Sequence, residues 1–319
     1  MRHELQALLR CPDCDHELEL SRTGPPPGAT EGPGQVREGA LRCGGCDRRV
    51  PVVDGIPRFV PSDDYAGSFS FEWNRFAVTQ LDSARGWTLS EERFQQSLDF
   101  PLHELKGKLV LDAGCGMGRF AEIVAKYGGT VVGADISYAV DAAARNLAPR
   151  TNAHVIQADL RQLPLRKGSF DLVYSLGVLH HTPDARRTFE ALLPYVKPGG
   201  KVSVTLYSGY NPAYVISTRF WRKLAAKISS KVVYYASHLA IPAYYLYRVP
   251  LVGLVAMAVF PISMHPDPEW RLLDTFDCYT PKYQSYHTHV EVYRWFRENG
   301  LTDIVVLEPA VSFIATRPV

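Results

Sequence analysis

The residues with the clearest chemical potential begin at position 112. Asp112-Ala-Gly114-Cys-Gly116-Met-Gly118 places a carboxylate directly before three alternating glycines. Glycines let a ligand approach the backbone closely and let a turn adopt unusual dihedral angles. The stretch lacks the Gly-Lys-Ser/Thr of a triphosphate site, and Arg119 stands where a dinucleotide site needs a small residue. Because a carboxylate would repel a pyrophosphate, Asp112 predicts a ligand that carries a cationic amino group instead.

Two further acids follow apolar runs farther along the chain. Val131-Val-Gly-Ala-Asp135 ends in a carboxylate 23 residues after Asp112, where it would accept both hydroxyls of a ribose. Ile156-Gln-Ala-Asp159-Leu160 places a third carboxylate where it would accept from an adenine amino group. S-adenosylmethionine (SAM) carries an amino group, a ribose and an adenine but no phosphate. The three acids together therefore predict a SAM site.

Two histidines are candidates for a general base. His181 follows an apolar run that ends near position 174, close to where a transferable methyl group would lie. His289 stands at the start of a predicted helix, where the helix dipole favours the neutral imidazole that a base requires. The alternatives stay open: His181 would shape a turn, and His289 would be a polar helix start.

Four of the six cysteines form two Cys-x-x-Cys pairs, Cys11/Cys14 and Cys43/Cys46. Two such pairs supply the closed set of four soft ligands that structural Zn²⁺ prefers. A segment of about 60 residues with few apolar side chains also needs a staple to fold. The pattern predicts one structural zinc, and four unligated thiols or a redox pair are the alternatives.

Short apolar runs alternate with helical stretches after residue 107, which is typical of a parallel sheet covered on both faces. A capping-box pattern at Thr288 and Glu291 predicts a helix that Gly300 ends. The two last runs are joined by so short a turn that they must be antiparallel. The predicted strands are Lys108–Asp112, Thr130–Ala134, His154–Gln157, Phe170–Tyr174, Lys201–Tyr207, Asp303–Leu307 and Val311–Thr316.

The glycine turn, Asp135, Ala158-Asp-Leu160, Leu179-His-His181 and Lys197-Pro-Gly-Gly200 occur in the order found in class I SAM-dependent methyltransferases. Residues 107–207 and 287–317 resemble the methyltransferase type 11 group of that family. The resemblance implies a Rossmann-like α/β fold, with a seven-stranded, mostly parallel sheet and one antiparallel strand. It also implies a set of residues that contact SAM: Asp112, Gly114, Gly116, Gly118, Asp135, Ile136, Asp159, Leu160 and Ser175.

The N-terminal cysteine segment resembles a second family. Arg48-Arg-Val-Pro-Val-Val-Asp-Gly-Ile-Pro57 follows the last cysteine pair in the manner of the Trm112-like zinc ribbons, over roughly residues 8–60. Relatives in that family act as partners of methyltransferases. We expect three parts in the chain: a zinc-ribbon module at 1–60, a connector or helical cap at 61–106, and a SAM-binding domain at 107–319. In the connector, Trp73 or Arg75 is expected to touch the cofactor.

The region from 208 to 280 is expected to be a helical insert that forms the acceptor site. No Asp or Glu occurs from Ala191 to Pro266, against eight Lys or Arg. Ser217 to Lys231 predicts an amphipathic helix with a basic side. Val249 to Met264 has no charge but is shorter than the roughly 20 residues of a membrane-spanning helix. This composition suits an apolar, anionic acceptor or a peripheral membrane contact.

Composition and net charge limit the class of protein and the partners that it could bind. With 319 residues, 46% of them hydrophobic, and a formal charge of +2, the chain is globular and its net charge does not favour nucleic acid. The first ten residues lack an apolar signal core, so a cytoplasmic protein is expected. The leading prediction is a methyltransferase for a small-molecule or lipid-like acceptor. The alternatives are an RNA-base methyltransferase whose zinc ribbon binds RNA, a protein methyltransferase, and a non-catalytic SAM-binding scaffold.

Overall fold

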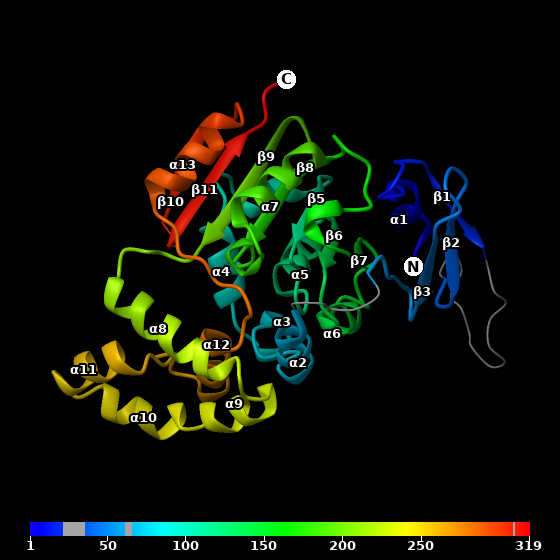
Figure 1. The fold of residues 1–319 in the computed structure, drawn as a ribbon. Helices are drawn as coiled ribbons and strands as arrows, with labels where there is room; N and C mark the ends of the chain where they lie inside the picture. Colours follow the sequence, from blue (N-terminus) through cyan, green and yellow to red (C-terminus); the bar gives the residue numbers. More distant parts are fainter. Residues whose placement is uncertain (22–35, 61–65, 309) are drawn as a thin grey trace.

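The computed structural model describes residues 1–21, 36–60, 66–308 and 310–319, and its centre is a seven-stranded sheet (Figure 1). The strand order is β10-β11-β9-β8-β5-β6-β7. Strands β5 to β9 are parallel, and β11 runs antiparallel to both β9 and β10, which confirms the predicted sheet. The strand bounds are β5 Leu109–Ala113, β6 Thr130–Asp135, β7 Ala153–Gln157, β8 Phe170–Leu176, β9 Val196–Leu206, β10 Thr302–Leu307 and β11 Val311–Thr316.

Helices cover both faces of this sheet. Buried side chains of α4 (Leu89–Gln95), α5 (Arg119–Lys126) and α6 (Ala139–Asn146) pack against one face. Those of α7 (Ala185–Leu192) and α13 (His289–Glu298) pack against the other. Helix α13 begins as predicted, because the Thr288 side chain accepts from the backbone N–H of Glu291. The short elements are α3 Asp82–Arg85, η2 Leu102–Leu105, η3 Leu160–Gln162, η4 Leu179–His181 and η5 Leu193–Tyr195.

A second, four-stranded antiparallel sheet lies beside the β7 edge of the main sheet (Figure 1). It consists of β1 (Leu18–Ser21), β2 (Gly39–Cys43), β3 (Arg49–Val53) and β4 (Ile56–Pro57), preceded by α1 (His3–Leu8). Arg58 joins the two sheets, since its guanidinium donates to Gln157 Oε1 at 2.9 Å and to Asp141 Oδ1 at 2.6 Å. The buried side chains of this small sheet belong to the same apolar cluster as one face of the main sheet.

Helices α8 to α12 form the insert between β9 and α13, at the lower left of Figure 1. Their bounds are α8 Pro212–Ala225, α9 Ser230–Ser237, α10 Ala240–Tyr247, α11 Val252–Val259 and α12 Pro268–Tyr279. The single helix predicted over Ser217–Lys231 is therefore wrong in its bounds. Asn211 caps α8 through Tyr214 N–H with Pro212 in the first turn, and a new helix begins at Ser230.

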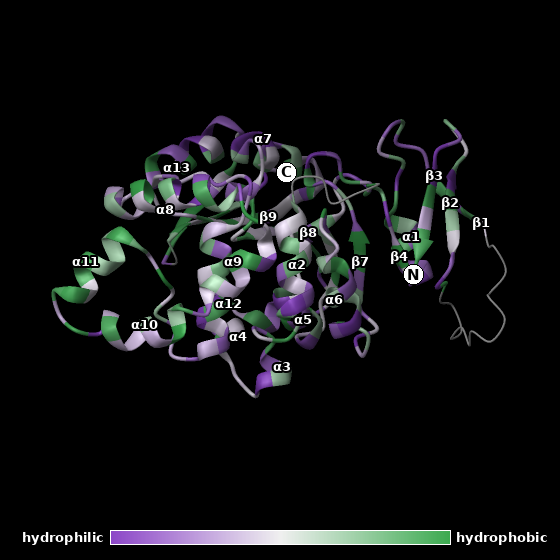
Figure 2. Ribbon diagram, turned by 60° about the horizontal axis from the view of Figure 1, so that its bottom comes forward, coloured by the Kyte–Doolittle hydropathy of each residue, from purple (hydrophilic) through white to green (hydrophobic). Residues whose placement is uncertain are grey.

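The insert has its own apolar cluster, in which α9 and α12 pack against α2 (Gly67–Arg75). Its outer surface is exposed: more than half of the exposed large apolar side chains in the described residues lie between Ile216 and Val259. Helix α11 buries none of its residues, and Figure 2 shows it as largely hydrophobic. Within the described part of the chain, no helix combines the length and hydropathy needed to cross a bilayer.

Candidate functional site

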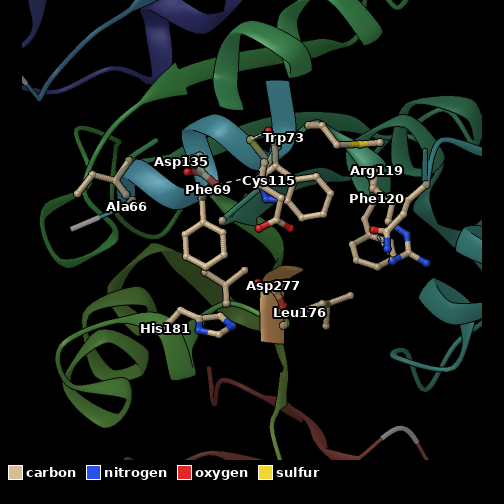
Figure 3. A pocket seen from close by; sticks show the side chains of 18 of the residues that line it. Ala66, Phe69, Trp73, Cys115, Arg119, Phe120, Asp135, Leu176, His181 and Asp277 are labelled. Atoms are coloured by element: carbon tan, nitrogen blue, oxygen red, sulfur yellow. Dashed lines mark hydrogen bonds between the residues drawn. The ribbon is translucent and has the colours of Figure 1, made fainter. Parts of the chain in front are cut away.

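A cavity of about 230 Å³, called the main cavity below, lies at the carboxyl ends of β5, β6 and β8 (Figure 3). Carboxyl ends of parallel strands are where ligands bind in open α/β sheets. Helix α2 lies across its opening, and α12 contributes a further wall. The residues that line it on the sheet side are Gly114, Cys115, Gly116, Met117, Asp135, Ile136, Leu160, Leu176, Gly177, Val178, His181 and Thr182.

The glycine turn gives this cavity a floor of bare backbone. Gly114 has a φ of 94°, and a Cβ there would collide with the side chain of Val178. Trp73 covers Gly116, where an added Cβ would lie 3.4 Å from the indole nitrogen. Gly118 does not line the cavity; it is the N-terminal cap of α5, with a φ of 90°. Two of the three predicted glycines therefore face the cavity and the third starts the helix.

Asp135 lies at the end of β6 and lines the cavity, as the ribose prediction requires. Its Oδ2 accepts from Gly116 N–H at 2.9 Å, and its Oδ1 accepts from the backbone and hydroxyl of Ser137 at 2.8 and 2.7 Å. Burial raises the pKa of the Asp135 carboxyl, and the bonds from Ser137 partly offset this. These bonds hold the carboxyl in one orientation beside the glycine turn.

Asp112 is placed differently from Asp135. Its carboxyl does not line the main cavity but lies sealed beneath the turn, where burial raises its pKa to about 7 and the nearby Tyr174 hydroxyl lowers it in part. Asp112 pairs with Gly133 of β6 and Tyr174 of β8, so its strand is central to the sheet. The contact of Asp112 with the amino group of a ligand stays a prediction, to which the lining of the cavity adds no support.

Asp159 and Ser175 are also placed away from the cavity. Asp159 caps the short helix η3 by accepting from Arg161 N–H at 2.9 Å, and it pairs with the Arg161 guanidinium at 2.5 Å. Ser175 is buried and donates to the carbonyl of Ala113 at 2.7 Å. Their neighbours Leu160 and Leu176 line the cavity instead, so an adenine ring would meet apolar side chains at this end.

Only one of the two candidate bases reaches the cavity. His181 lines it, and its Nδ1 lies 3.0 Å from the carbonyl oxygen of Tyr283. Because a carbonyl only accepts, Nδ1 carries the hydrogen and the Nε2 of a neutral ring keeps its lone pair. Burial lowers the His181 pKa, which favours that neutral form. His289 does not line the cavity: its ring stacks on that of Tyr210 with 5.6 Å between the ring centres, and its role as a base stays a prediction.

Of the two α2 residues expected to touch the cofactor, only Trp73 lines the cavity. Trp73 and the neighbouring Phe69 line the cavity, and Phe69 lies 5.2 Å from His181, ring centre to ring centre (Figure 3). Arg75 turns away and lies over the ring of Tyr234 at 5.5 Å. Helix α2 therefore covers the cavity with aromatic side chains.

Sequence reasoning missed three acids that α2 and α12 contribute to the cavity wall. Glu72 comes from α2, and Asp274 and Asp277 come from α12, some 200 residues later. Burial raises the pKa of Asp274 to about 7, and it raises that of Glu72 well above its ordinary value. The spacing of Asp274 and Asp277 by three residues places them on one helix face. Nothing in the local sequence connects that face with Glu72.

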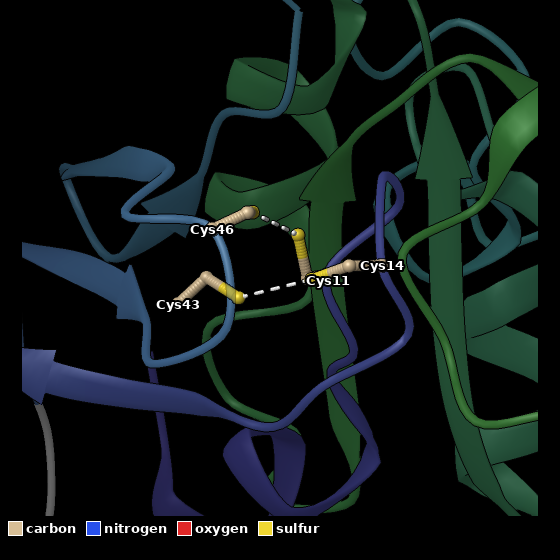
Figure 4. A group of neighbouring side chains, drawn as sticks. All are labelled: Cys11, Cys14, Cys43 and Cys46. Carbon is tan, nitrogen blue, oxygen red and sulfur yellow. Dashed lines mark hydrogen bonds between the residues drawn. The ribbon is translucent and has the colours of Figure 1, made fainter.

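The four paired cysteines come together in the small sheet (Figure 4). Their sulfur atoms all lie within 4.8 Å of one another, with 3.5 Å between Cys11 and Cys46 and 3.3 Å between Cys14 and Cys43. Four thiols converging from two turns are the donor set and arrangement that tetrahedral Zn²⁺ takes.

Comparisons with known proteins agree with the core of this site. Residues 111–204 match the model of a family described as a methyltransferase domain, which confirms the resemblance for the segment from β5 to β9. The crystal structure of a S-adenosylmethionine-dependent methyltransferase from Mesorhizobium loti is 35% identical, with a TM-score of 0.31, over 36% of this chain and 51% of that one.

Two curated relatives are ubiquinone biosynthesis O-methyltransferases. The protein of Coxiella burnetii is 34% identical over 113 residues, or 35% of this chain and 48% of the relative. That of Acinetobacter baumannii is 38% identical over 104 residues, or 31% of this chain and 43% of the relative. The chain thus spans about half the length of the curated relatives it matches. The likeness of residues 8–60 to a zinc-ribbon family stays a prediction.

Proposed function

We propose that this chain is a SAM-dependent methyltransferase that acts on a small-molecule acceptor with an apolar body. The observation that carries the proposal is the main cavity itself. It joins a bare glycine turn to a buried acid at the end of the next strand, inside the segment that matches a methyltransferase domain. Bound there, SAM would supply an activated methyl group on a sulfonium.

The residues divide this work between binding and chemistry. Asp135 would accept from the ribose hydroxyls, and Gly114 and Gly116 allow close approach of the ligand to the backbone. Ile136 and Leu160 supply apolar contacts for the adenine. For a hydroxyl acceptor, the neutral His181 would take the proton. Phe69 and Trp73 exclude water from the transfer, which is mainly a matter of proximity and orientation.

Substitution of Asp135 tests the cofactor assignment. We expect Asp135→Ala to weaken SAM binding by about 1–3 kcal/mol, because the ribose loses a charged acceptor. Asp159→Ala is the matched control and should leave the affinity unchanged, because that carboxylate is held by Arg161 outside the cavity. Isothermal titration calorimetry on both folded variants measures the difference. A larger effect from Asp159 than from Asp135 would reverse the assignment of the two acids.

Methyl transfer itself is tested with methyl-labelled SAM and fractionated cell extract. We expect label in a small-molecule or lipid fraction for the native protein and none for Asp135→Ala. Label in RNA would favour the RNA-base alternative, and label in protein would favour protein methylation. SAM binding without transfer to any fraction would leave a non-catalytic scaffold.

The insert supports a lipid-like acceptor and a peripheral membrane contact. We define the insert face as the exposed apolar side chains of α8 to α11, and among them Leu251 and Leu254 are 78% and 74% exposed. Six basic residues lie on the same segment, which has no acid: Arg219, Arg222, Lys223, Lys227, Lys231 and Arg248. Apolar side chains flanked by cations complement a membrane surface of anionic lipids. An apolar groove of about 260 Å³ beside Trp221, Leu224 and Phe260 offers room for part of an apolar chain.

The proposal also covers the metal site, the division of the chain into domains and the location of the protein in the cell. Cys11, Cys14, Cys43 and Cys46 would hold one structural Zn²⁺, with no open position for catalysis. Residues 1–60 would form the zinc-ribbon module, 61–106 the connector and 107–319 the methyltransferase domain with its insert at about 208–280. The free cysteines suit a reducing compartment, so we place the protein in the cytoplasm, at the membrane surface.

A further inference from the structure

We propose that Glu72, Asp274 and Asp277 bind the protonated amine of the methyl acceptor, which makes the chain an N-methyltransferase. The inference rests on the proposed function and adds the chemical class of the acceptor. It concerns the wall of the main cavity to which α2 and α12 contribute. We call these three residues the acidic trio.

The trio lies where two cavities meet. An outer cavity of about 700 Å³ lies between the insert and α4, and it is lined by Tyr207, Tyr214 and Trp270 among others. It shares four residues with the main cavity: Gln80, Arg119, Asp274 and Asp277. A molecule in the outer cavity would therefore reach the glycine turn by passing the two aspartates. Glu72 lines only the main cavity, at the inner end of that route.

Among the three acids, Glu72 gives the strongest evidence that the main cavity binds a cation. Its side chain is 0% exposed, and neither carboxylate oxygen has a hydrogen-bond partner in the described residues. The charges that act on it are negative, since Asp277 and Asp274 add to burial in raising its pKa. A buried carboxylate without a donor or a counter-charge is costly. The cost is removed when a ligand brings the missing positive charge.

The number of free acceptors matches an ammonium group. Asp277 accepts from the Tyr207 hydroxyl at 2.9 Å through Oδ2, while its buried Oδ1 has no partner in the described chain. With the two oxygens of Glu72, this makes three buried acceptors that lack a donor. A protonated primary amine has three N–H donors, whereas a hydroxyl has only one. Charge and donor number therefore both favour an amine over an alcohol.

The cationic side chains near the acidic trio have other hydrogen-bond partners. The Arg119 guanidinium donates to Ser90 Oγ at 2.8 Å and to Gln80 Oε1 at 3.1 Å, and its charge lowers the pKa of Asp274. Arg222 donates to the carbonyl of Pro281. His181 is held neutral by burial, although the field of Asp277 raises its pKa. Asp274 thus has a partial counter-charge in Arg119, whereas no cation of the described residues is among the groups that act on Glu72.

Transfer of the methyl group to the amine needs only SAM, the bound ammonium and a carboxylate of the trio. The bound ammonium gives one proton to a carboxylate of the trio, which frees the nitrogen lone pair. That pair forms the new N–C bond to the methyl group, and the electrons of the breaking C–S bond pass to sulfur. The products are S-adenosylhomocysteine and an N-methylated amine, and the carboxylate returns its proton to water.

The test compares two probes of the same shape, n-hexylamine and n-hexanol, by calorimetry on protein saturated with S-adenosylhomocysteine. We expect hexylamine to bind at least ten times more tightly than hexanol. In Glu72→Gln and Asp277→Asn that preference should fall to less than twofold, while hexanol affinity stays the same. Glu104→Gln, a change at an exposed acid remote from the cavities, is the matched control and should keep the full preference.

Three results would overturn the proposal: no binding of hexylamine, equal affinity for the two probes, or a preference that survives both trio substitutions. A fourth would reassign the trio. If Glu72→Gln weakens S-adenosylhomocysteine binding tenfold or more, Glu72 binds the amino group of the cofactor rather than that of the acceptor. Failure of the native protein to bind S-adenosylhomocysteine would instead refute the proposed function.

Discussion

The small cysteine sheet and the insert, the two parts added to the main sheet, differ in where their apolar side chains lie. The small cysteine sheet extends the core: the buried side chains of β1 to β3 and those on one face of the main sheet form one apolar cluster, and Arg58 joins the small sheet to β7. The insert has a separate cluster and leaves α11 wholly unburied. One addition turns its apolar side chains inward and the other turns many outward. The small cysteine sheet therefore adds to the core, whereas the insert leaves exposed the apolar side chains for which we propose a membrane contact.

Loss of the metal site should give the largest effect. We expect one zinc per chain in the native protein and none in Cys43→Ser, with a loss of unfolding free energy of about 4 kcal/mol or more. The small cysteine sheet shares an apolar cluster with one face of the main sheet. The melting of the main sheet should therefore shift as well. Elemental analysis and calorimetric melting measure both quantities.

Cys278→Ser is the matched control for the metal, because this buried cysteine lies on α12, far from the cluster of four. It should retain one zinc per chain. Native protein without metal would contradict the zinc assignment. Loss of zinc with an unchanged melting of residues 107–207 would show that the ribbon is independent of the sheet after all.

Substitutions on the insert face should have the next largest effect. The double variant Leu251→Glu/Leu254→Glu removes two exposed leucines and adds two negative charges. We expect its binding to phosphatidylglycerol vesicles to fall about 100-fold, or close to 3 kcal/mol, because each leucine contributes roughly 1.5–3 kcal/mol when buried. Vesicle sedimentation measures this. Binding of the native protein should be weaker to phosphatidylcholine vesicles and weaker in 0.5 M salt.

Val306→Glu is the control for the vesicle assay, because it changes an exposed apolar side chain on β10, outside the insert. It should bind vesicles as the native protein does. If the native protein stays in the supernatant with both lipids, the membrane contact is wrong. A native dimer that dissociates in the double variant would instead assign the insert face to a second copy of the chain.

The smallest effect concerns the pH dependence of stability. Asp274 on α12 has a pKa raised to about 7 by burial, so the folded protein binds its proton more tightly than the unfolded chain does. The stabilisation is complete below about pH 4, the pKa of an unperturbed aspartate, and is lost as the pH rises through 7. Native protein should therefore gain about 1–2 kcal/mol relative to Asp274→Asn on going from pH 8 to pH 5.

Thermal melting of both proteins across this pH range isolates Asp274, because Glu72 and Asp112 are present in each. Hydrogen exchange should locate the gain in the insert and leave the ribbon unaffected. An equal gain in the two proteins would mean that the Asp274 carboxyl titrates normally, and that the acidic trio is less desolvated than its burial indicates.

The nucleotide half of the site could be predicted because its geometry is local. Asp135 ends a strand, and the glycines follow the neighbouring strand within a few residues, so the pairing of β5 with β6 brings them together. Asp112, Asp159 and Ser175 are predicted by the same reasoning, yet they do not line the main cavity. Sequence shows that a residue lies near a strand end but not whether its side chain points into the cavity, beneath the turn or toward a neighbour such as Arg161.

The sequence by itself determined the order of the strands along the chain, the start of α13, the four-cysteine cluster and the glycine turn, because each depends on residues a few positions apart or on a ligand-pair pattern. Only the tertiary structure decided the other half of the site. Glu72 of α2 lines the same cavity as Asp274 and Asp277 of α12. His289 lies outside that cavity, against Tyr210. Many apolar side chains of α8 to α11 are exposed. These outcomes depend on how distant helices pack, and packing is set by the summed fit of many side chains rather than by any local pattern.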